Sequence, residues 1–300
     1  MKLVIMNDIH IRPTAPINRK DDYVEAQFRK LRQMIDYSNS LCARMLIGGD
    51  LLDKPTVPYW LLNRLITELR RHEREIYVVP GNHDLVGNNY ELVNQCSLKT
   101  LSESSVIDLF ELPTLAFLGN EGGKPVYVSA WPFGTAPTEP VPEDVRAILL
   151  LHFPVFESSV PFYFKDALTV EQLEAKYPGY DRIITGDIHE VAVKSKTIVT
   201  GSMMRMTIAQ RDYKPRFYVL DTIENTVEPV FFDIETDVWR DVTEQVADEE
   251  YKEALTELAD AMRERDERLD YPTVCRSLAA DNPKYEGMIQ TLINEHGGKV

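Results

Sequence analysis

The hydrophobic and polar positions alternate between short apolar runs and longer amphipathic stretches. Apolar runs of strand length lie at residues 2–6, 44–47 and 75–79. The segments at 23–37 and 60–70 repeat their apolar residues every three or four positions, which is the spacing of one helix face. This alternation predicts strand–helix units that build a layered α/β sheet.

From residue 106 onward the apolar runs follow one another closely. They lie at 106–110, 126–131, 147–153, 182–188, 196–199, 217–220 and 227–234. We therefore predict an α/β fold, a layered β-sandwich of two mixed sheets flanked by helices.

The chain changes character near its end. Residues 247–269 show helical apolar spacing with acidic residues between the apolar ones. We predict a main domain at residues 1–236 and an acidic, mainly helical C-terminal extension at 237–300, which would serve as a cap or a partner contact. The plainer alternative is that its apolar stripe packs on the protein's own core.

The composition is that of a globular chain, with 44% hydrophobic and 27% charged residues. The first apolar run is too short for a signal peptide, and no run reaches the length of a membrane span. We expect a cytoplasmic protein without a membrane segment. The three cysteines, an odd number without paired spacing, suit reduced thiols.

The net charge of −15 argues against a protein that coats nucleic acid through a basic face. It leaves room for an enzyme that acts on phosphate esters, because bound divalent ions can supply the positive charge locally. Residues 241–300 hold 15 acidic and 7 basic residues, so they carry more than half of the excess negative charge.

Five apolar runs end in polar residues of the kinds that bind metals. Four of the six histidines lie there, and the run ends read Asn7-Asp8-Ile9-His10, Gly48-Gly49-Asp50, Gly81-Asn82-His83-Asp84, His152 and Gly186-Asp187-Ile188-His189. In α/β sheets the carboxyl ends of strands converge on one site. The pattern therefore predicts a site for two divalent ions.

The spacing inside these run ends supports that prediction. One residue separates Asp8 from His10, and one separates Asp187 from His189, so each pair would share a face of an extended segment. Taken singly, each group has a plainer explanation as a turn, a helix cap or a core histidine. Together and in this order they favour a metal site. We expect His72 to be a solvated helix residue.

The ordered set DxH, GD, GNHD, H and GDxH resembles the calcineurin-like metallophosphoesterase superfamily. The stretches "GGDLLDKPTVP" and "VTGSMMR" are similar to segments of SbcD-type DNA-repair exonuclease subunits. The resemblance implies one metal held by Asp8, His10, Asp50 and His189, and a second held by Asp50, Asn82, His152 and Asp187. It also implies that His83 positions the scissile phosphate and protonates the leaving oxygen, with Asp84 and Arg205 in supporting positions.

The family has histidine where this chain has Asp187. An aspartate offers a shorter, anionic oxygen ligand, so the second site would be rich in oxygen and would favour manganese, or magnesium, over zinc. Alternatively, the Asp187 side chain points away and leaves the second metal with three protein ligands.

The resemblance implies a two-metal phosphodiester hydrolase, and the most similar proteins are DNA exo- or endonucleases. It implies DNA as substrate, a P-loop ATPase partner of the SbcC type and a homodimer. A phosphodiesterase or phosphatase acting on small nucleotides or other phosphoesters is the alternative. A second alternative is a non-catalytic subunit of a repair complex, in which Asp187 has weakened metal binding.

Overall fold

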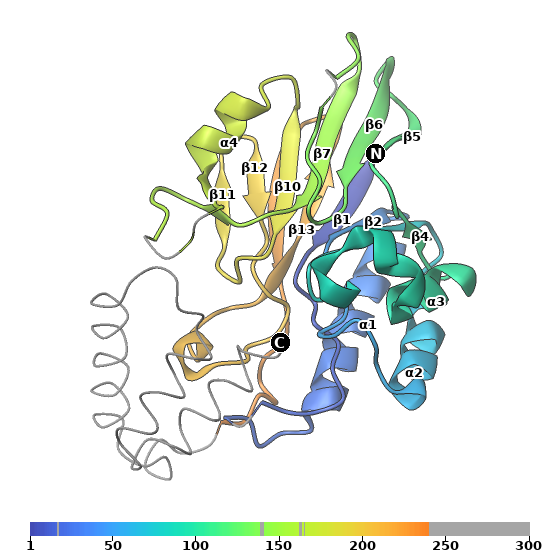
Figure 1. Ribbon diagram of the computed structural model, residues 1–300, viewed down its shortest axis with the longest axis vertical. Coiled ribbons are helices and arrows are strands. Elements are labelled where there is room, and N and C mark those ends of the chain that lie inside the picture. The colour runs from blue at the N-terminus through green and yellow to red at the C-terminus, as the bar shows by residue number, and fades with distance from the viewer. Residues whose placement is uncertain (17, 139–140, 162–163, 165, 240–300) are drawn as a thin grey trace. The chain divides into compact units, whose positions relative to one another are not determined.

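The computed structural model describes residues 1–239 with the exception of residues 17, 139–140, 162–163 and 165. Its described strands form two six-stranded sheets and one short two-stranded ribbon, and the helices lie outside the sheets (Figure 1). The predicted architecture of two mixed sheets flanked by helices is confirmed. No helix among the described residues is both long and apolar enough to cross a bilayer.

The first sheet has the strand order β14-β13-β1-β2-β3-β4. Strands β1 to β4 are parallel, whereas β13 runs antiparallel to β1 and β14 antiparallel to β13. The strands are β1 (Lys2–Met6), β2 (Arg44–Gly48), β3 (Ile76–Val79), β4 (Asp108–Leu109), β13 (Arg216–Asp221) and β14 (Thr226–Phe231).

The second sheet has the order β11-β12-β10-β7-β6-β5. Its four central strands are parallel, and the two edge strands are antiparallel to their neighbours. The strands are β5 (Thr114–Glu121), β6 (Lys124–Trp131), β7 (Arg146–His152), β10 (Arg182–Gly186), β11 (Ala192–Lys194) and β12 (Thr197–Val199). The ribbon pairs β8 (Val155–Phe156) with β9 (Leu168–Thr169).

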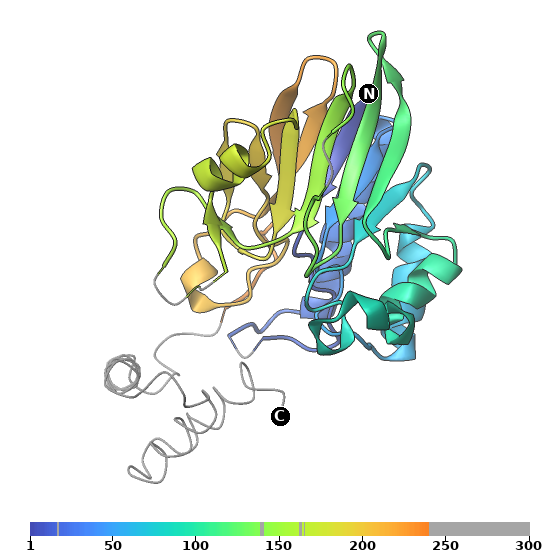
Figure 2. The same cartoon turned by 45° about the horizontal axis from the view of Figure 1, so that its top comes forward.

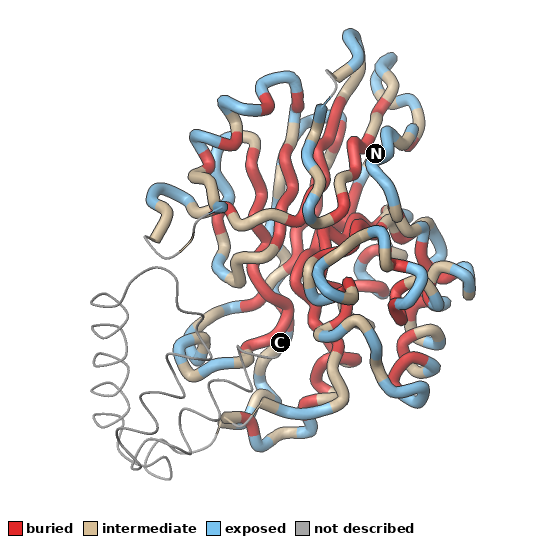
Figure 3. The backbone as a smooth tube through the Cα atoms, in the orientation of Figure 1, coloured by how far each residue is buried: buried red, intermediate tan, exposed pale blue. Residues whose placement is uncertain are grey.

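Alternation along each strand divides the core into layers. On β1, Leu3 and Ile5 pack between the two sheets, whereas Val4 and Met6 face the helix layer. Figure 2 shows the green and yellow strands of the second sheet in front of the blue and orange strands of the first. The central strands of both sheets hold mostly buried residues, drawn red in Figure 3, whereas the edge strands β5 and β14 are largely exposed.

Helices cover the outer faces of both sheets. α1 (Tyr23–Ser40) is capped at its N-terminus by Asp22, whose side chain accepts a hydrogen bond from the Glu25 N–H at 3.0 Å. α1, α2 (Tyr59–Leu69) and α3 (Ser97–Glu103) pack on the first sheet, and α4 (Val170–Lys176) packs on the second. The remaining helical turns are η1 (Val86–Asn88), η2 (Tyr90–Gln95) and η3 (Ile208–Gln210).

Three details differ from the sequence predictions. The strand predicted at 106–110 is reduced to β4, because Val106 and Ile107 pack into the helix layer instead. The elements that were not predicted are β5, β8, β9, β11, α3 and α4. His72 follows α2 and is buried, with Nε2 2.9 Å from the Ser38 hydroxyl and Nδ1 2.8 Å from the Arg74 carbonyl, so its prediction as a solvated helix residue was wrong.

The last described residues belong to the compact unit Met1–Trp239. The Asp237 side chain is fully buried, with carboxylate oxygens 2.9 Å from Arg19 Nη2, 3.2 Å from Lys30 Nζ and 2.8 Å from Arg205 Nη2. The amphipathic stretch at 247–269 lies outside the described residues. The division of the chain at residue 236 and the helical extension stay predictions.

Candidate metal centre

The polar residues at the five strand ends meet at one edge of the two sheets. They follow β1 and β2, end β7, and follow β3 and β10, so each arrives at the carboxyl end of a parallel strand. Three overlapping groups place their ligand atoms within 4.8 Å of one another: Asp8, His10 and His189; His10, Asp50 and His83; Asp8, Asp50 and His152.

The backbone that delivers these side chains is not extended. Asp8, His10 and Asp50 have left-handed φ angles of 53°, 51° and 53°, and Asp187 has a φ of 99°. The predicted reason why Asp8 and His10 converge was therefore wrong. Their side chains converge while both residues have left-handed backbone conformations after β1, which Asp and His adopt more readily than most residues.

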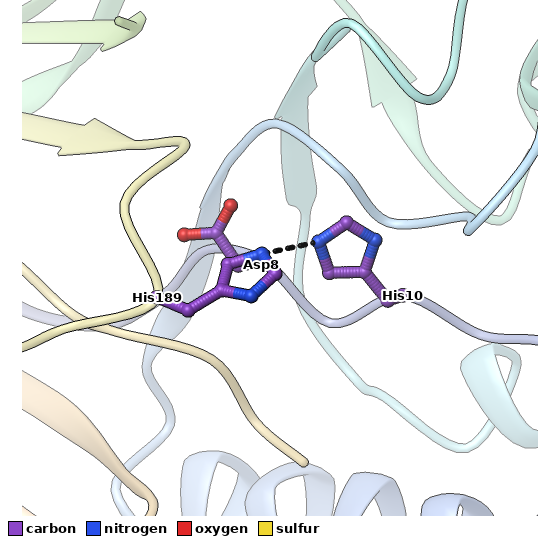
Figure 4. A group of neighbouring side chains, drawn as sticks. All are labelled: Asp8, His10 and His189. Carbon is purple, nitrogen blue, oxygen red and sulfur yellow. Dashed lines mark hydrogen bonds between the residues drawn. The ribbon is translucent and has the colours of Figure 1, made fainter. Parts of the chain in front are cut away.

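Asp8, His10 and His189 form the first group (Figure 4). The Nε2 atoms of the two imidazoles lie 3.0 Å apart. Two nitrogen ligands held by one ion at about 2.1 Å each, at right angles, are separated by about 3.0 Å. The Asp8 carboxylate is fixed beside them, because the Asp187 N–H donates to its Oδ1 at 3.0 Å.

Asp50 lies between this group and His152. Its Oδ2 is 3.5 Å from His10 Nε2 and 3.4 Å from His152 Nε2, so one oxygen faces both imidazoles. Its Oδ1 accepts from the His83 N–H at 2.9 Å. This position suits a carboxylate that bridges two ions.

A second donor set surrounds His152. Its Nδ1 donates to the Gly48 carbonyl at 2.8 Å, which leaves Nε2 as the ligand atom. That Nε2 lies 2.9 Å from Asn82 Oδ1 and 3.7 Å from Asp187 Oδ1. The Asp187 side chain therefore lies beside His152, but Asp187 belongs to none of the three donor groups, so its place as a ligand stays a prediction.

His83 is exposed at the rim of the centre. Its Nδ1 donates to the Asp53 carbonyl at 2.9 Å, because a carbonyl can only accept, and this leaves Nε2 for other partners. Its ring centroid is 4.8 Å from that of His10. Asp84 lies behind His83 and accepts from the N–H groups of Gly81 at 3.0 Å and Leu52 at 2.8 Å.

Two glycines allow the loops to approach the ligands this closely. A Cβ on Gly49, which has a φ of +100°, would lie 2.1 Å from His152 Nδ1. A Cβ on Gly81 would lie 2.2 Å from Asp50 Oδ1. Any side chain at either position would displace a ligand.

The protein's own charges do not balance at this edge. Burial raises the pKa of Asp8 well above its usual range, with the neighbouring Asp50 charge adding to the shift. Burial opposes ionisation of Asp50 too, but the His152 charge and hydrogen bond outweigh it and hold the pKa of Asp50 below its usual range. Burial lowers the pKa of His10 and of His189, which favours the neutral imidazole that binds metals. Burial acts in the same direction on His152, but the neighbouring Asp50 and Asp187 outweigh it and raise its pKa, so an ion bound at its Nε2 would take the place of a proton.

The residues therefore fit two divalent ions. The donor atoms are carboxylate, amide and imidazole groups at metal-ligand spacing, and two of the imidazoles face each other through Nε2. Buried carboxylates crowded together are stabilised when cations lie between them.

Three residues that support the centre were not singled out from the sequence. The Asn7 side chain links the two sheets, because its Oδ1 accepts from the Gly48 N–H at 2.6 Å and its Nδ2 donates to the Thr185 carbonyl at 2.7 Å. Asp53 contacts both His83 and His10, and Arg12 lies beside Asp53. Asp53 lies within the quoted "GGDLLDKPTVP" stretch, three residues after Asp50. Its place in that stretch could have identified it as a site residue.

Arg205, predicted as a supporting residue, lies outside the donor groups. Its guanidinium pairs with the buried Asp237. Its segment nevertheless contacts the centre from behind, because the Met203 N–H donates to the Asp8 carbonyl at 3.1 Å and the Thr200 hydroxyl accepts from the Asn7 N–H at 3.0 Å.

Comparison with known proteins follows this geometry. The family model for calcineurin-like phosphoesterases matches residues 1–191. No curated protein matches the chain.

Several solved structures are similar to the chain. A dimetal phosphatase from Danio rerio is 10% identical, covers 80% of this chain and 98% of its own, and has a TM-score of 0.51. A protein of Thermus thermophilus is 11% identical, covers 77% of this chain and 98% of its own, and has a TM-score of 0.48. An archaeal phosphodiesterase is 14% identical, covers 77% of this chain and 100% of its own, and has a TM-score of 0.40. At such identities the Danio rerio structure supports the fold.

Gly49→Ala is expected to weaken Mn²⁺ binding by about tenfold or more, because the added methyl group would push His152 out of place. Isothermal titration calorimetry with MnCl₂ measures this. Gly134→Ala is the matched control, since Gly134 also has a positive φ, of +82°, but has open space around its Cβ position. Equal affinity in both variants would contradict the proposed place of His152 in the centre.

Proposed function

The chain belongs to the calcineurin-like phosphoesterase family, and from this premise we propose that it is a two-metal phosphodiesterase acting on DNA, a nuclease of the SbcD type. The observation that carries the proposal is Asp50, which faces both His10 and His152 through one oxygen and therefore joins two donor sets into one centre.

We propose the following metal ligands. Asp50 would be shared, with Asp8, His10 and His189 completing the first site and Asn82, His152 and Asp187 completing the second. When bound there, divalent ions lower the pKa of the water nucleophile and neutralise charge that develops on the phosphate. The second set contains three oxygen donors and one nitrogen, which favours Mn²⁺ or Mg²⁺ over Zn²⁺.

His83 is the proposed general acid. Its exposure lets a substrate reach it, and the Asp53 carbonyl fixes the proton on Nδ1 and the orientation of the ring. In its imidazolium form His83 also carries a proton on Nε2, and this is the proton that it would give to the leaving oxygen. The Asp84 carboxylate holds the turn that carries His83, because it accepts hydrogen bonds from the Gly81 N–H in that turn and from the Leu52 N–H in the loop after β2.

Two segments support DNA as the substrate. The stretch "GGDLLDKPTVP" is similar to SbcD-type subunits, and its Asp53 contacts His83. The stretch "VTGSMMR" is similar as well, and it contacts the backbone of Asp8 through Met203. Both similarities thus fall on residues that position the centre.

A phosphodiesterase or phosphatase with small substrates is the second candidate, favoured by the net charge of −15. A non-catalytic subunit is the third, suggested by the unusual Asp187. The complete donor set and the exposed His83 count against it, because a scaffold needs neither.

The wild-type protein with Mn²⁺ is expected to degrade end-labelled linear DNA and to hydrolyse bis-p-nitrophenyl phosphate. His83→Ala is expected to lower kcat on DNA by about 10²–10⁴-fold while Mn²⁺ affinity in calorimetry stays unchanged, because a general acid is lost and no ligand is removed.

Each other outcome has a distinct meaning. Hydrolysis of the small ester with intact DNA would favour the small-substrate enzyme, and turnover of neither would favour the non-catalytic subunit. Loss of Mn²⁺ binding in His83→Ala would make His83 a ligand.

Asp187→Ala is expected to reduce the tightly bound Mn²⁺ from two ions to one per chain, because the second set loses a carboxylate. Glu190→Ala, a change of an exposed carboxylate nearby, serves as the control. Metal content after gel filtration measures the outcome, and two retained ions would remove Asp187 from the ligand set.

We also propose a homodimer and a P-loop ATPase partner of the SbcC type. The SbcD-like segments support both partners. The chain has no Walker sequence, the phosphate-binding motif of P-loop ATPases, so ATP hydrolysis would come from the partner. An exposed aromatic pair at the start of α2, where Tyr59 is 84% and Trp60 is 52% exposed, offers a contact surface. The acidic, apolar-striped stretch after Asp241 is the proposed ATPase contact.

Sedimentation velocity tests these partners. The full chain is expected to sediment as a dimer and to co-sediment with such an ATPase. A chain without residues 241–300 is expected to lose the ATPase and keep Mn²⁺ binding. Unchanged co-sedimentation would exclude this segment as the contact.

A further inference from the structure

Arg12 lies two residues after His10, and its guanidinium has no close hydrogen-bond acceptor. Its Nη1 is 3.6 Å from Asp53 Oδ1, its Nη2 is 3.5 Å from the Thr14 hydroxyl, and its buried Nε has no partner. Charge-assisted hydrogen bonds of arginine are normally about 2.7–2.9 Å long. The guanidinium is thus held near the centre with unused donor capacity.

The backbone of Arg12 is firmly fixed. The Gln27 side chain of α1 accepts from the Arg12 N–H at 2.9 Å and donates to the Arg12 carbonyl at 3.0 Å. The preceding residue, Ile11, pairs with Leu52 in an isolated parallel bridge. The arginine therefore projects from a rigid loop, which lowers the entropy cost of binding a ligand.

Asp53 connects Arg12 to the reacting groups. Its carbonyl orients His83, its carboxylate is 3.8 Å from His10 Nδ1, and the same carboxylate oxygen faces Arg12. The Arg12 side chain is 26% exposed and His83 is exposed. A substrate that reaches His83 can therefore extend toward the neighbouring Arg12 guanidinium.

We propose that Arg12 binds a second phosphate of the substrate, the one adjacent to the scissile phosphate in a polynucleotide. The inference rests on the proposed phosphodiesterase function and adds a substrate requirement to it. A planar guanidinium can bind two oxygens of a phosphate at once. In a chain with a net charge of −15, a polyanionic substrate needs such local positive charge beyond that of the metal ions.

The pairing with Asp53 gives a competing explanation. Arg12 could act only by orienting Asp53, and through it His10 and His83. In that case its loss would slow hydrolysis of every phosphodiester equally, including esters that contain a single phosphate. The two explanations therefore differ in their dependence on substrate length.

The test compares three substrates. Bis-p-nitrophenyl phosphate and the dinucleoside monophosphate TpT contain one phosphate, and a ten-residue oligothymidylate contains several. Arg12→Met is expected to lower kcat/KM for the oligothymidylate by about 10–100-fold, mainly through KM, and to change the one-phosphate substrates by less than about twofold. Arg12→Lys, which keeps the charge but not the planar fork, should recover part of the loss.

Two further measurements separate substrate binding from a structural effect. For the oligothymidylate, Arg12→Met is expected to reduce the slope of log KM against log salt concentration by about 0.7, the value for one lost contact to a single strand. Mn²⁺ affinity should stay unchanged. Arg44→Met is the matched control, because Arg44 pairs with Glu75 at 2.8 Å at the opposite end of β2.

Equal losses on all three substrates, or no loss on the oligothymidylate, would overturn the proposal. It would also fall if the wild-type enzyme showed no preference for the oligothymidylate over TpT. That last result, with bis-p-nitrophenyl phosphate still hydrolysed, would leave the phosphoesterase function standing, whereas no hydrolysis of any substrate would refute the function itself.

Discussion

Crowded negative charge at the edge of two sheets is the constraint on which the rest of the structure depends. Asp8, Asp50 and Asp84 are buried, and each accepts hydrogen bonds from backbone N–H groups. Several residues that follow the strands have left-handed φ angles, and glycines leave room for the close approach of the loops. The irregular backbone is therefore a means of stabilising carboxylates that would otherwise repel one another, and it makes the same carboxylates available to cations.

The position of Asp187 separates two roles that one residue can have. Its backbone N–H fixes the Asp8 carboxylate, and its side chain faces His152. Any residue except proline can supply the N–H, so exchange of histidine for aspartate leaves the orientation of Asp8 intact. The consequence of the exchange is confined to the second donor set, where an oxygen replaces a nitrogen.

The sequence predicted the layered fold and grouped the donor residues because both depend on local patterns. Strand ends marked by Asp, Asn and His are visible along the chain, and the alternation of strands and helices indicates the layers. The short α3 and α4, seven residues each, offer too few turns for periodicity to register, and the edge strand β5 has few buried positions. Asn7 and Asp53 could not be assigned roles, because their contacts join loops that lie far apart in sequence. The reason given for the convergence of Asp8 and His10 was wrong because left-handed turns are a tertiary effect.

The pairing of β1 with β13 has a consequence for how the protein is made. Lys2 pairs with Asp221, and the loop after β1 depends on Asp187, Thr200 and Met203 for its hydrogen bonds. Contacts of such long sequence separation slow folding. β1 can pair with β2 early, but a ribosome must release the chain through β13 before β1 gains its second neighbour. A nascent chain that stops short of β13 has the donor residues of the early motifs without the complete frame that brings them together. Formation of the centre is in this way tied by topology to synthesis of the chain through β13.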